Sequence, residues 1–273
     1  MKKLFKPLLI VVITVFALSC KDEDKTEPKP SASNLIKIGE IYISGANAKA
    51  TVYAEKALET GYNELFVALS DSTDGSTLTK GHLHINPMMD MGMMKHSTPI
   101  ENTGDSTPSN GYYKVPVVFI MAGTSSQWSL GISFHNHKND MEGEGNLGVE
   151  VINSSPTKIT NTTISLDSSA KVFISLITPK KPLVGMNDFE IVLHKKVSMM
   201  DFPAIENYTI EIVPEMPSMG HGSPNNVNPI HLANGHYIGK VNFTMTGLWK
   251  IKLKLYKNGT LISDDQFFEI TLH

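Results

Sequence analysis

Short segments in which apolar and polar residues alternate recur along the chain. The clearest covers residues 249–256, WKIKLKLY, where four large apolar side chains alternate with three lysines. Because successive side chains of a strand point to opposite faces of a sheet, this pattern predicts a strand with one buried face. Other strand-like segments, at 50–53, 65–69, 115–120 and 128–134, are separated by clusters of Gly, Asn, Pro and Ser. We therefore expect an all-β protein.

The second half of the chain repeats the first at an offset of 124 residues. Residues 61–69, GYNELFVAL, match residues 185–193, GMNDFEIVL, and the two tryptophans, Trp128 and Trp249, correspond after a three-residue insertion in the first copy. Two units of about 120 residues are each large enough to bury a core of their own. The pattern predicts two immunoglobulin-like β-sandwiches, at residues 35–155 and 156–273.

The N-terminus has the pattern of a secretory leader. Three lysines precede an apolar run at residues 8–18, which is too short to span a bilayer. The run ends in Ala17-Leu18-Ser19-Cys20, which resembles a bacterial lipobox, and Cys20 is the single cysteine of the chain. We expect residues 1–19 to be a signal peptide and Cys20 to carry the lipid that anchors the mature protein in the membrane.

A polar tether is expected after the lipidated cysteine. Residues 20–34 have few apolar side chains and cannot offset the entropy of ordering, so they are predicted to be disordered. The tether begins Lys21-Asp22-Glu23-Asp24, which resembles the export signal of surface lipoproteins in the Bacteroidota. The sequence therefore predicts an outer-membrane lipoprotein, with its periplasmic or cell-surface orientation left open.

Charge excludes one class of partner. Without the leader, the chain has 21 lysines against 27 acidic residues, a net charge of −6, and it contains no arginine. Nucleic acid binding requires a basic face, and phosphate recognition commonly uses the guanidinium fork. We therefore expect no nucleic acid partner.

A methionine and histidine motif occurs once in each half. Residues 91–96, MGMMKH, and residues 216–221, MPSMGH, share the pattern Met-x-x-Met-x-His. A thioether is a soft donor that needs no deprotonation, and with imidazole it favours Cu(I), while Cu(II) also accepts imidazole. Copper is thus the expected ion, and its predicted ligands are Met91, Met94, His96, Met216, Met219 and His221.

The second motif carries a family resemblance. Residues 214–222, PEMPSMGHG, followed by 234–237, NGHY, and 243–249, FTMTGLW, resemble the YtkA-like/FixH-like domain. Members are small β-sandwich modules of bacterial envelopes, often associated with copper handling. The first copy departs from this pattern, because Asp90 stands where the family has proline and Lys95 replaces the glycine before the histidine.

Further donors surround the two motifs. Met121 and Met245 fall in predicted strands, where inward packing is the default. The spacing of His135 and His137 repeats that of His82 and His84, and either pair is a surface pair or part of a separate Cu(II) or Zn(II) site. His194 is expected to be solvated. Secondary ligand candidates are Met89, Met93, His82, His84, His231 and His236, the last two if their loops converge on His221.

Three functions remain open, and none is enzymatic, because the chain lacks a nucleophile elbow, a phosphate-binding glycine loop and a His-Glu-x-x-His motif. The first is copper chaperoning, scavenging or delivery, with a donor or acceptor protein as partner. The second is a structural or adhesive surface protein in which the methionines only pack. The third is a glycan- or peptide-binding module.

Overall fold

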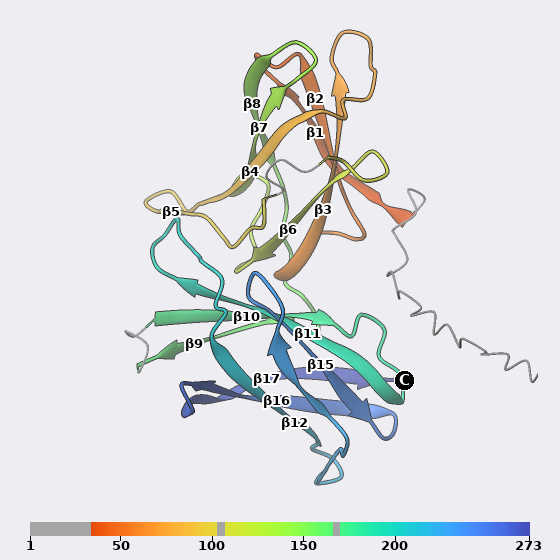
Figure 1. Ribbon diagram of the computed structural model, residues 1–273, viewed down its shortest axis with the longest axis vertical. Coiled ribbons are helices and arrows are strands. Elements are labelled where there is room, and N and C mark those ends of the chain that lie inside the picture. Colours follow the sequence, from red (N-terminus) through yellow and green to blue (C-terminus); the bar gives the residue numbers. More distant parts are fainter. Residues whose placement is uncertain (1–33, 103–106, 166–169) are drawn as a thin grey trace, which may run out of the picture.

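The computed structural model describes residues 34–102, 107–165 and 170–273. Over these ranges the chain forms strands and no α-helix, which confirms the predicted all-β class. The strands build two immunoglobulin-like β-sandwiches, one above the other in Figure 1. The predicted signal peptide, Cys20 and nearly all of the tether lie outside the described residues.

The first sandwich consists of two four-stranded antiparallel sheets. One has the order β1-β2-β3-β6, formed by Ile36–Ile43, Ala48–Ala54, Gly61–Asp71 and Tyr113–Phe119. The other has the order β5-β4-β7-β8, formed by Lys95–His96, Gly81–Asp90, Trp128–Asn136 and Met141–Gly148.

Over the described residues, the second sandwich has the same arrangement with one additional strand. Its first sheet has the order β14-β15-β11-β10-β9, formed by Val227–His231, His236–Phe243, Gly185–Lys196, Ala170–Thr178 and Ile159–Ile164. Its second sheet has the order β13-β12-β16-β17, formed by His221–Gly222, Tyr208–Met216, Gly247–Lys257 and Thr260–Leu272. Among the residues of the first sandwich that the structure describes, none forms a counterpart of β14.

Registers and side-chain contacts also repeat. Gly61 pairs with Phe119, and their counterparts 124 residues later, Gly185 and Phe243, pair in the same way. In each copy an asparagine amide donates hydrogen bonds to two nearby backbone carbonyl groups. Asn63 donates to Glu59 and Gly61, and Asn187 donates to Leu183 and Gly185. The two halves are therefore built on one plan.

Each sandwich encloses its own apolar core. Trp128 and Trp249 are fully buried in the first and second cores, respectively. In β16 the buried and less buried positions alternate, as the sequence predicts for this strand. Truncating a buried tryptophan to alanine typically lowers the free energy of unfolding by about 3–5 kcal/mol. The two tryptophans therefore contribute strongly to the stability of their cores.

The two sandwiches are in contact through hydrogen bonds and ion pairs. The Ser97 amide donates to the Met199 carbonyl oxygen at 2.8 Å. The His236 imidazole lies between the carboxylates of Glu101, in the first sandwich, and Glu190, in its own. Burial disfavours charge on His236, but hydrogen bonds to both carboxylates outweigh it and raise its pKa to about 9.

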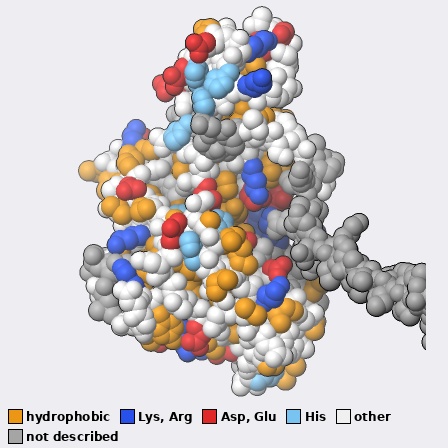
Figure 2. Space-filling view, in the orientation of Figure 1, with side chains coloured by type: hydrophobic (Ala, Val, Ile, Leu, Met, Phe, Trp, Pro, Cys, Tyr) orange, Lys and Arg blue, Asp and Glu red, His pale blue; other side chains and the backbone are white. Residues whose placement is uncertain are grey.

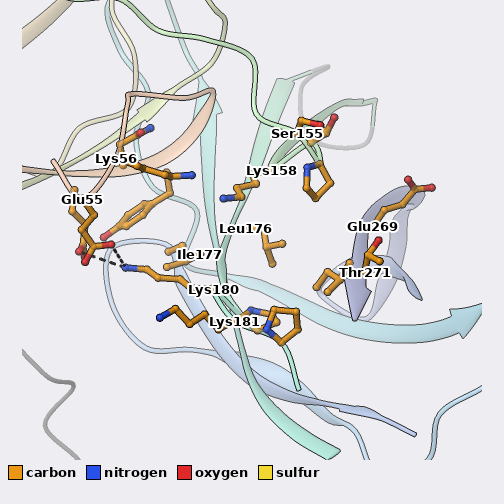
Figure 3. Close-up of a pocket in the computed structure, with 18 of the residues that line it drawn as sticks. Glu55, Lys56, Ser155, Lys158, Leu176, Ile177, Lys180, Lys181, Glu269 and Thr271 are labelled. Atoms are coloured by element: carbon orange, nitrogen blue, oxygen red, sulfur yellow. Dashed lines mark hydrogen bonds and ion pairs between the residues drawn. The ribbon is translucent and has the colours of Figure 1, made fainter. Parts of the chain in front are cut away.

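A cleft of about 510 Å³ lies between the sandwiches (Figure 3). Two of its lysines pair with carboxylates: Lys180 contacts Glu55 at 3.1 Å, and Lys158 lies 3.7 Å from Glu59, a residue just outside the lining. No helix in the described part of the chain is long and apolar enough to cross a membrane.

Candidate metal centres

The first candidate site lies where the hairpin β4–β5 meets the start of β7. Met89 is the cross-strand partner of both His96 and Trp128, so the three residues lie at one level of the sheet. Met121, which follows β6, completes the group, and its backbone carbonyl accepts a 3.1 Å hydrogen bond from the Trp128 indole nitrogen. The His96 and Trp128 rings meet edge to face, with 5.6 Å between their centroids.

The His96 imidazole has a defined orientation. Its Nδ1 lies 2.7 Å from the Ser97 carbonyl oxygen, which can only accept, so Nδ1 carries the proton. In the neutral ring Nε2 then carries no proton, and its lone pair can bind a metal ion. Nε2 lies 3.2 Å from the Met121 sulfur. This separation is close to that of two ligand atoms on one metal ion with bonds of about 2.0 and 2.3 Å.

The site is closely packed. Met89 is 2% exposed and His96 is 7% exposed, while Met121 is half-buried. Gly123 allows the close approach, because a Cβ atom there would lie only 2.8 Å from Met89 Cε and 2.9 Å from Trp128 Cδ1. An ion at this place would be largely shielded from water, which strengthens its interaction with neutral ligands.

The second candidate site has the same composition. Met216 is the cross-strand partner of His221, and the His221 ring lies 5.9 Å from the Trp249 ring, again close to perpendicular. His221 Nδ1 donates to the carbonyl oxygen of the next residue, as His96 does. The Trp249 indole donates to the Met245 carbonyl oxygen at 3.0 Å. Met216 is buried, whereas Met245 is 38% exposed.

The structure changes the correspondence that the sequence motif suggests. Met216 is equivalent to Met89, because each pairs with the site histidine and packs against the glycine that follows β6 or β15. Pairing Met216 with Met91 was therefore wrong by two residues. The reason is the hairpin: seven positions separate Met89 from His96, but only five separate Met216 from His221.

The remaining motif methionines lie on the hairpin tips. Met91 and Met94 are about half exposed, Met93 is fully exposed, and Met219 is 61% exposed. Both tips turn at a glycine with positive φ, Gly92 and Gly220. These thioethers are accessible to solvent next to the buried pairs, so they are placed to contact an ion or a partner before the inner residues do.

Two predicted histidine ligands lie elsewhere. His236 is engaged by Glu101 and Glu190, and His231 packs beside Tyr237 at 5.3 Å between ring centroids. They do not converge on His221, because both lie at the start of β15, whereas the site residue Met245 follows the other end of that strand. His194, expected to be solvated, is 4% exposed, and burial lowers its pKa to about 4.

The structure also brings together three histidines that the sequence treated as two pairs. His82, His135 and His137 form a cluster, and His84 lies outside it. Met121 and Met245, which the sequence places in strands, follow β6 and β15 and lie beside the site tryptophans. The signal available in the sequence was their shared Met-x-Gly spacing upstream of a tryptophan in both copies.

The comparisons support the family resemblance in the second half. Residues 167–254 match the model of the YtkA-like family, and this range contains all members of the second candidate site. No curated protein matches the chain.

Solved structures that are similar to the chain have low identity. The Escherichia coli adhesin FdeC is 14% identical with a TM-score of 0.27, over 85% of this chain and 66% of the adhesin. Domains 5–6 of the S-layer protein SbsC are 13% identical with a TM-score of 0.28, over 87% of this chain and 97% of that one. The fibronectin(III)-like modules of Clostridium thermocellum CbhA are 12% identical with a TM-score of 0.21, over 82% and 93%.

Proposed function

We propose that this protein is an envelope-anchored lipoprotein that binds Cu(I) at one Met/His/Trp site in each sandwich and chaperones, scavenges or delivers the ion. The observation that carries the proposal is the placement of the unprotonated His96 Nε2 at 3.2 Å from the Met121 sulfur, beside buried Met89. The same residue types occupy the equivalent positions of the second sandwich.

The donor set selects for a soft monovalent ion. Each site offers two thioethers and one imidazole, none of which carries a negative charge, and at the buried first site water compensates the charge of an ion poorly. Cu(I) carries one charge and prefers soft ligands, whereas Zn²⁺ prefers thiolate, imidazole and carboxylate. Trp128 and Trp249 add an aromatic wall that favours a cation.

The exposed hairpin tips suit exchange of the ion. Met91, Met93 and Met94 extend the thioether set of the first site outward, and Met219 does so for the second. Methionine is flexible and packs adaptably against partners. Ligand exchange between these tips and a copper donor or acceptor protein would move the ion without releasing it into water.

The proposed lipid on Cys20 and the acidic tether would locate this activity at the outer membrane. A lipid on Cys20 would hold the sandwiches within reach of a membrane or surface partner. Copper in this compartment meets oxidising conditions, under which a thiolate site is prone to disulfide formation and a thioether site is not.

Titration of the untagged mature chain with Cu(I), against a competing chelator, tests the proposal. We expect two ions per chain with dissociation constants below micromolar. Because each site adjoins one of the only two tryptophans, binding should also change the tryptophan fluorescence. A chain that binds no Cu(I) at this level would instead be a surface module whose methionines only pack.

A further inference from the structure

A second kind of metal site is suggested at the end of the first sandwich away from its neighbour, where histidine side chains gather on the surface (Figure 2). His82 in β4 and His135 in β7 are direct cross-strand partners. His137 follows β7 by one residue, two positions after His135. Antiparallel pairing places partner side chains on the same face, so the strands bring two of the three imidazoles together.

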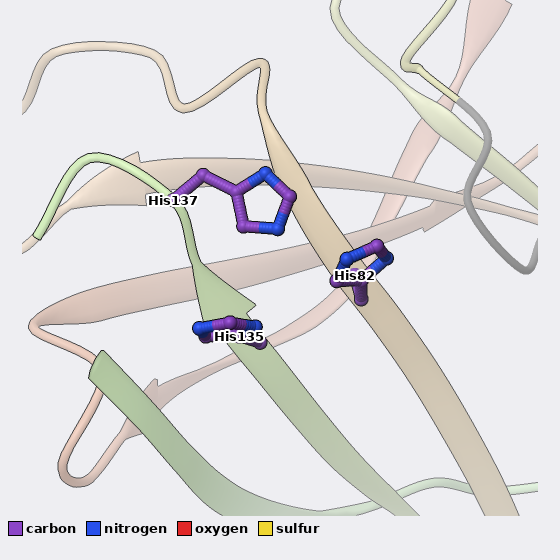
Figure 4. Close-up of side chains that lie close together, drawn as sticks. All are labelled: His82, His135 and His137. Atoms are coloured by element: carbon purple, nitrogen blue, oxygen red, sulfur yellow. The ribbon is translucent and has the colours of Figure 1, made fainter. Parts of the chain in front are cut away.

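The three rings are close enough to share one ion. One nitrogen from each lies within 4.8 Å of the others. The His82 ring centroid is 4.5 Å from that of His137 and 5.8 Å from that of His135. Figure 4 shows the three side chains, carried by two strands and the turn that follows one of them, converging on one space. His84 is the cross-strand partner of Ser133 and does not belong to the cluster.

Hydrogen bonds fix the turn that carries His137. The fully buried Asn136 donates to the Ala46 carbonyl oxygen and accepts from the Lys138 amide. The Lys138 ammonium pairs with Asp71 at 2.7 Å and with Asp74 at 3.2 Å. The turn is therefore held, and the ammonium of Lys138, next to His137 in the sequence, is paired with two carboxylates.

Asp140 provides the outer support that metal-binding imidazoles usually have. Its carboxylate accepts a 2.9 Å hydrogen bond from His135 Nε2, which leaves Nδ1 as the nitrogen of His135 with a lone pair. A carboxylate in this position orients the ring and increases its basicity toward an ion.

We propose that His82, His135 and His137 form a site for a divalent transition-metal ion, with Asp140 as a positioning residue. Three neutral imidazoles suit Cu(II) and Zn(II), and the Irving–Williams order places Cu(II) first. All four side chains reach the surface, so a fourth position is open to water or to a partner's ligand. The site differs in donor type and in place from the Met/His/Trp sites: His82 and Met89 are separated by seven residues of strand, roughly 23 Å.

Zn(II) is a more selective probe of this site than copper. Thioethers bind Zn(II) poorly, so the Met/His/Trp sites should contribute little to the measured binding. The untagged mature chain is titrated with Zn(II) in competition with a chromophoric chelator. We expect one site, with affinity at least about tenfold weaker in His82→Ala and in His137→Ala. Asp140→Asn should weaken binding by about tenfold, as loss of an outer-shell partner does.

The matched control is His84→Ala, which removes an exposed histidine from the same strand but outside the cluster. It should leave Zn(II) binding unchanged, as should Met121→Leu. Cu(II) should displace Zn(II) and give a nitrogen-coordinated electron paramagnetic resonance spectrum that the His82→Ala, His137→Ala double variant lacks. A parent without a Zn(II) site, an equal loss in His84→Ala, or an unchanged Cu(II) spectrum in the double variant would overturn the proposal. None of these outcomes bears on Cu(I) binding.

Discussion

Met89 and Met216 occupy the same place in the two sandwiches, each opposite a histidine across a short hairpin and each beside a buried tryptophan. Their equivalence defines the site by its buried members and leaves the hairpin tips free to vary in length. The first tip has two more residues than the second and contains additional methionines. The buried residues have the same arrangement in both sandwiches, whereas the hairpin tips differ in length. This is consistent with Cu(I) binding by the buried residues and Cu(I) exchange through the methionines of the tips.

Met121→Leu should weaken Cu(I) binding at the first site by at least about tenfold, or about 1.4 kcal/mol. The reason is the loss of the sulfur that lies 3.2 Å from His96 Nε2. Leucine keeps a similar volume, so the melting temperature should change by no more than a few degrees. The measurement is chelator competition, with Met93→Leu as the control, because Met93 is fully exposed on the same hairpin. Equal affinities for both variants would exclude Met121 as a ligand.

In the second sandwich, Met245→Leu should reduce Cu(I) affinity more than Met219→Leu does. Met245 occupies the place of Met121, and its backbone carbonyl is fixed by the Trp249 indole, whereas Met219 is 61% exposed on the hairpin tip. Met219→Leu should mainly slow transfer of Cu(I) to an acceptor chelator. The two variants are compared by equilibrium competition and by stopped-flow transfer. The ranking is contradicted if Met219→Leu causes the larger loss at equilibrium.

Much of the fold follows from the sequence, since alternation in segments such as 249–256 reflects local geometry. The site is only partly predictable in this way. A spacing motif assumes hairpins of equal length, and the two extra residues after Met89 were enough to shift the pairing from Met89 to Met91. The cluster of His82 with His135 and His137 depends on the register between β4 and β7, which the sequence does not specify.

The contact between the sandwiches should weaken at high pH. The pKa of His236 is raised above the ordinary value of 6.5, to about 9, so the stability from its charged form is fully present below pH 6.5 and is lost as the pH rises through about 9. The loss should be on the order of 3 kcal/mol. Besides Glu101 and Glu190, the groups near the ring are Tyr62 and His194.

Thermal unfolding between pH 6 and 10 measures this effect. Glu101→Gln removes the carboxylate from the first sandwich and should flatten the alkaline decline, while Glu55→Gln, which affects a surface ion pair between the sandwiches, should leave it in place. A decline of the same size in Glu101→Gln would assign it to other groups.

Acid should destabilise the second sandwich through His194. Burial lowers the pKa of this imidazole to about 4, so the stability of its neutral form is fully present above pH 6.5 and is lost as the pH falls through about 4. His194→Leu should reduce the slope of stability between pH 6.5 and 5, where few carboxylates titrate. Urea unfolding at several pH values checks this. An unchanged slope in the variant would contradict the assignment.

Cys20→Ser should leave an uncleaved precursor or release the protein from membranes, because the hydroxyl cannot take the place of the lipidated thiol. The measurement is membrane fractionation together with the mass of the mature chain. The folded domains should keep their melting temperature, since Cys20 precedes the first strand by many residues. Unchanged membrane association of the variant would rule out this anchor.

The most direct test of the central claim is the Cu(I) stoichiometry of four matched variants of the mature chain. The account predicts two ions per chain in the parent and in His84→Ala, one tightly bound ion in His96→Ala and in His221→Ala, and none in the double variant. Two ions retained in the double variant, or none bound by the parent, would contradict it.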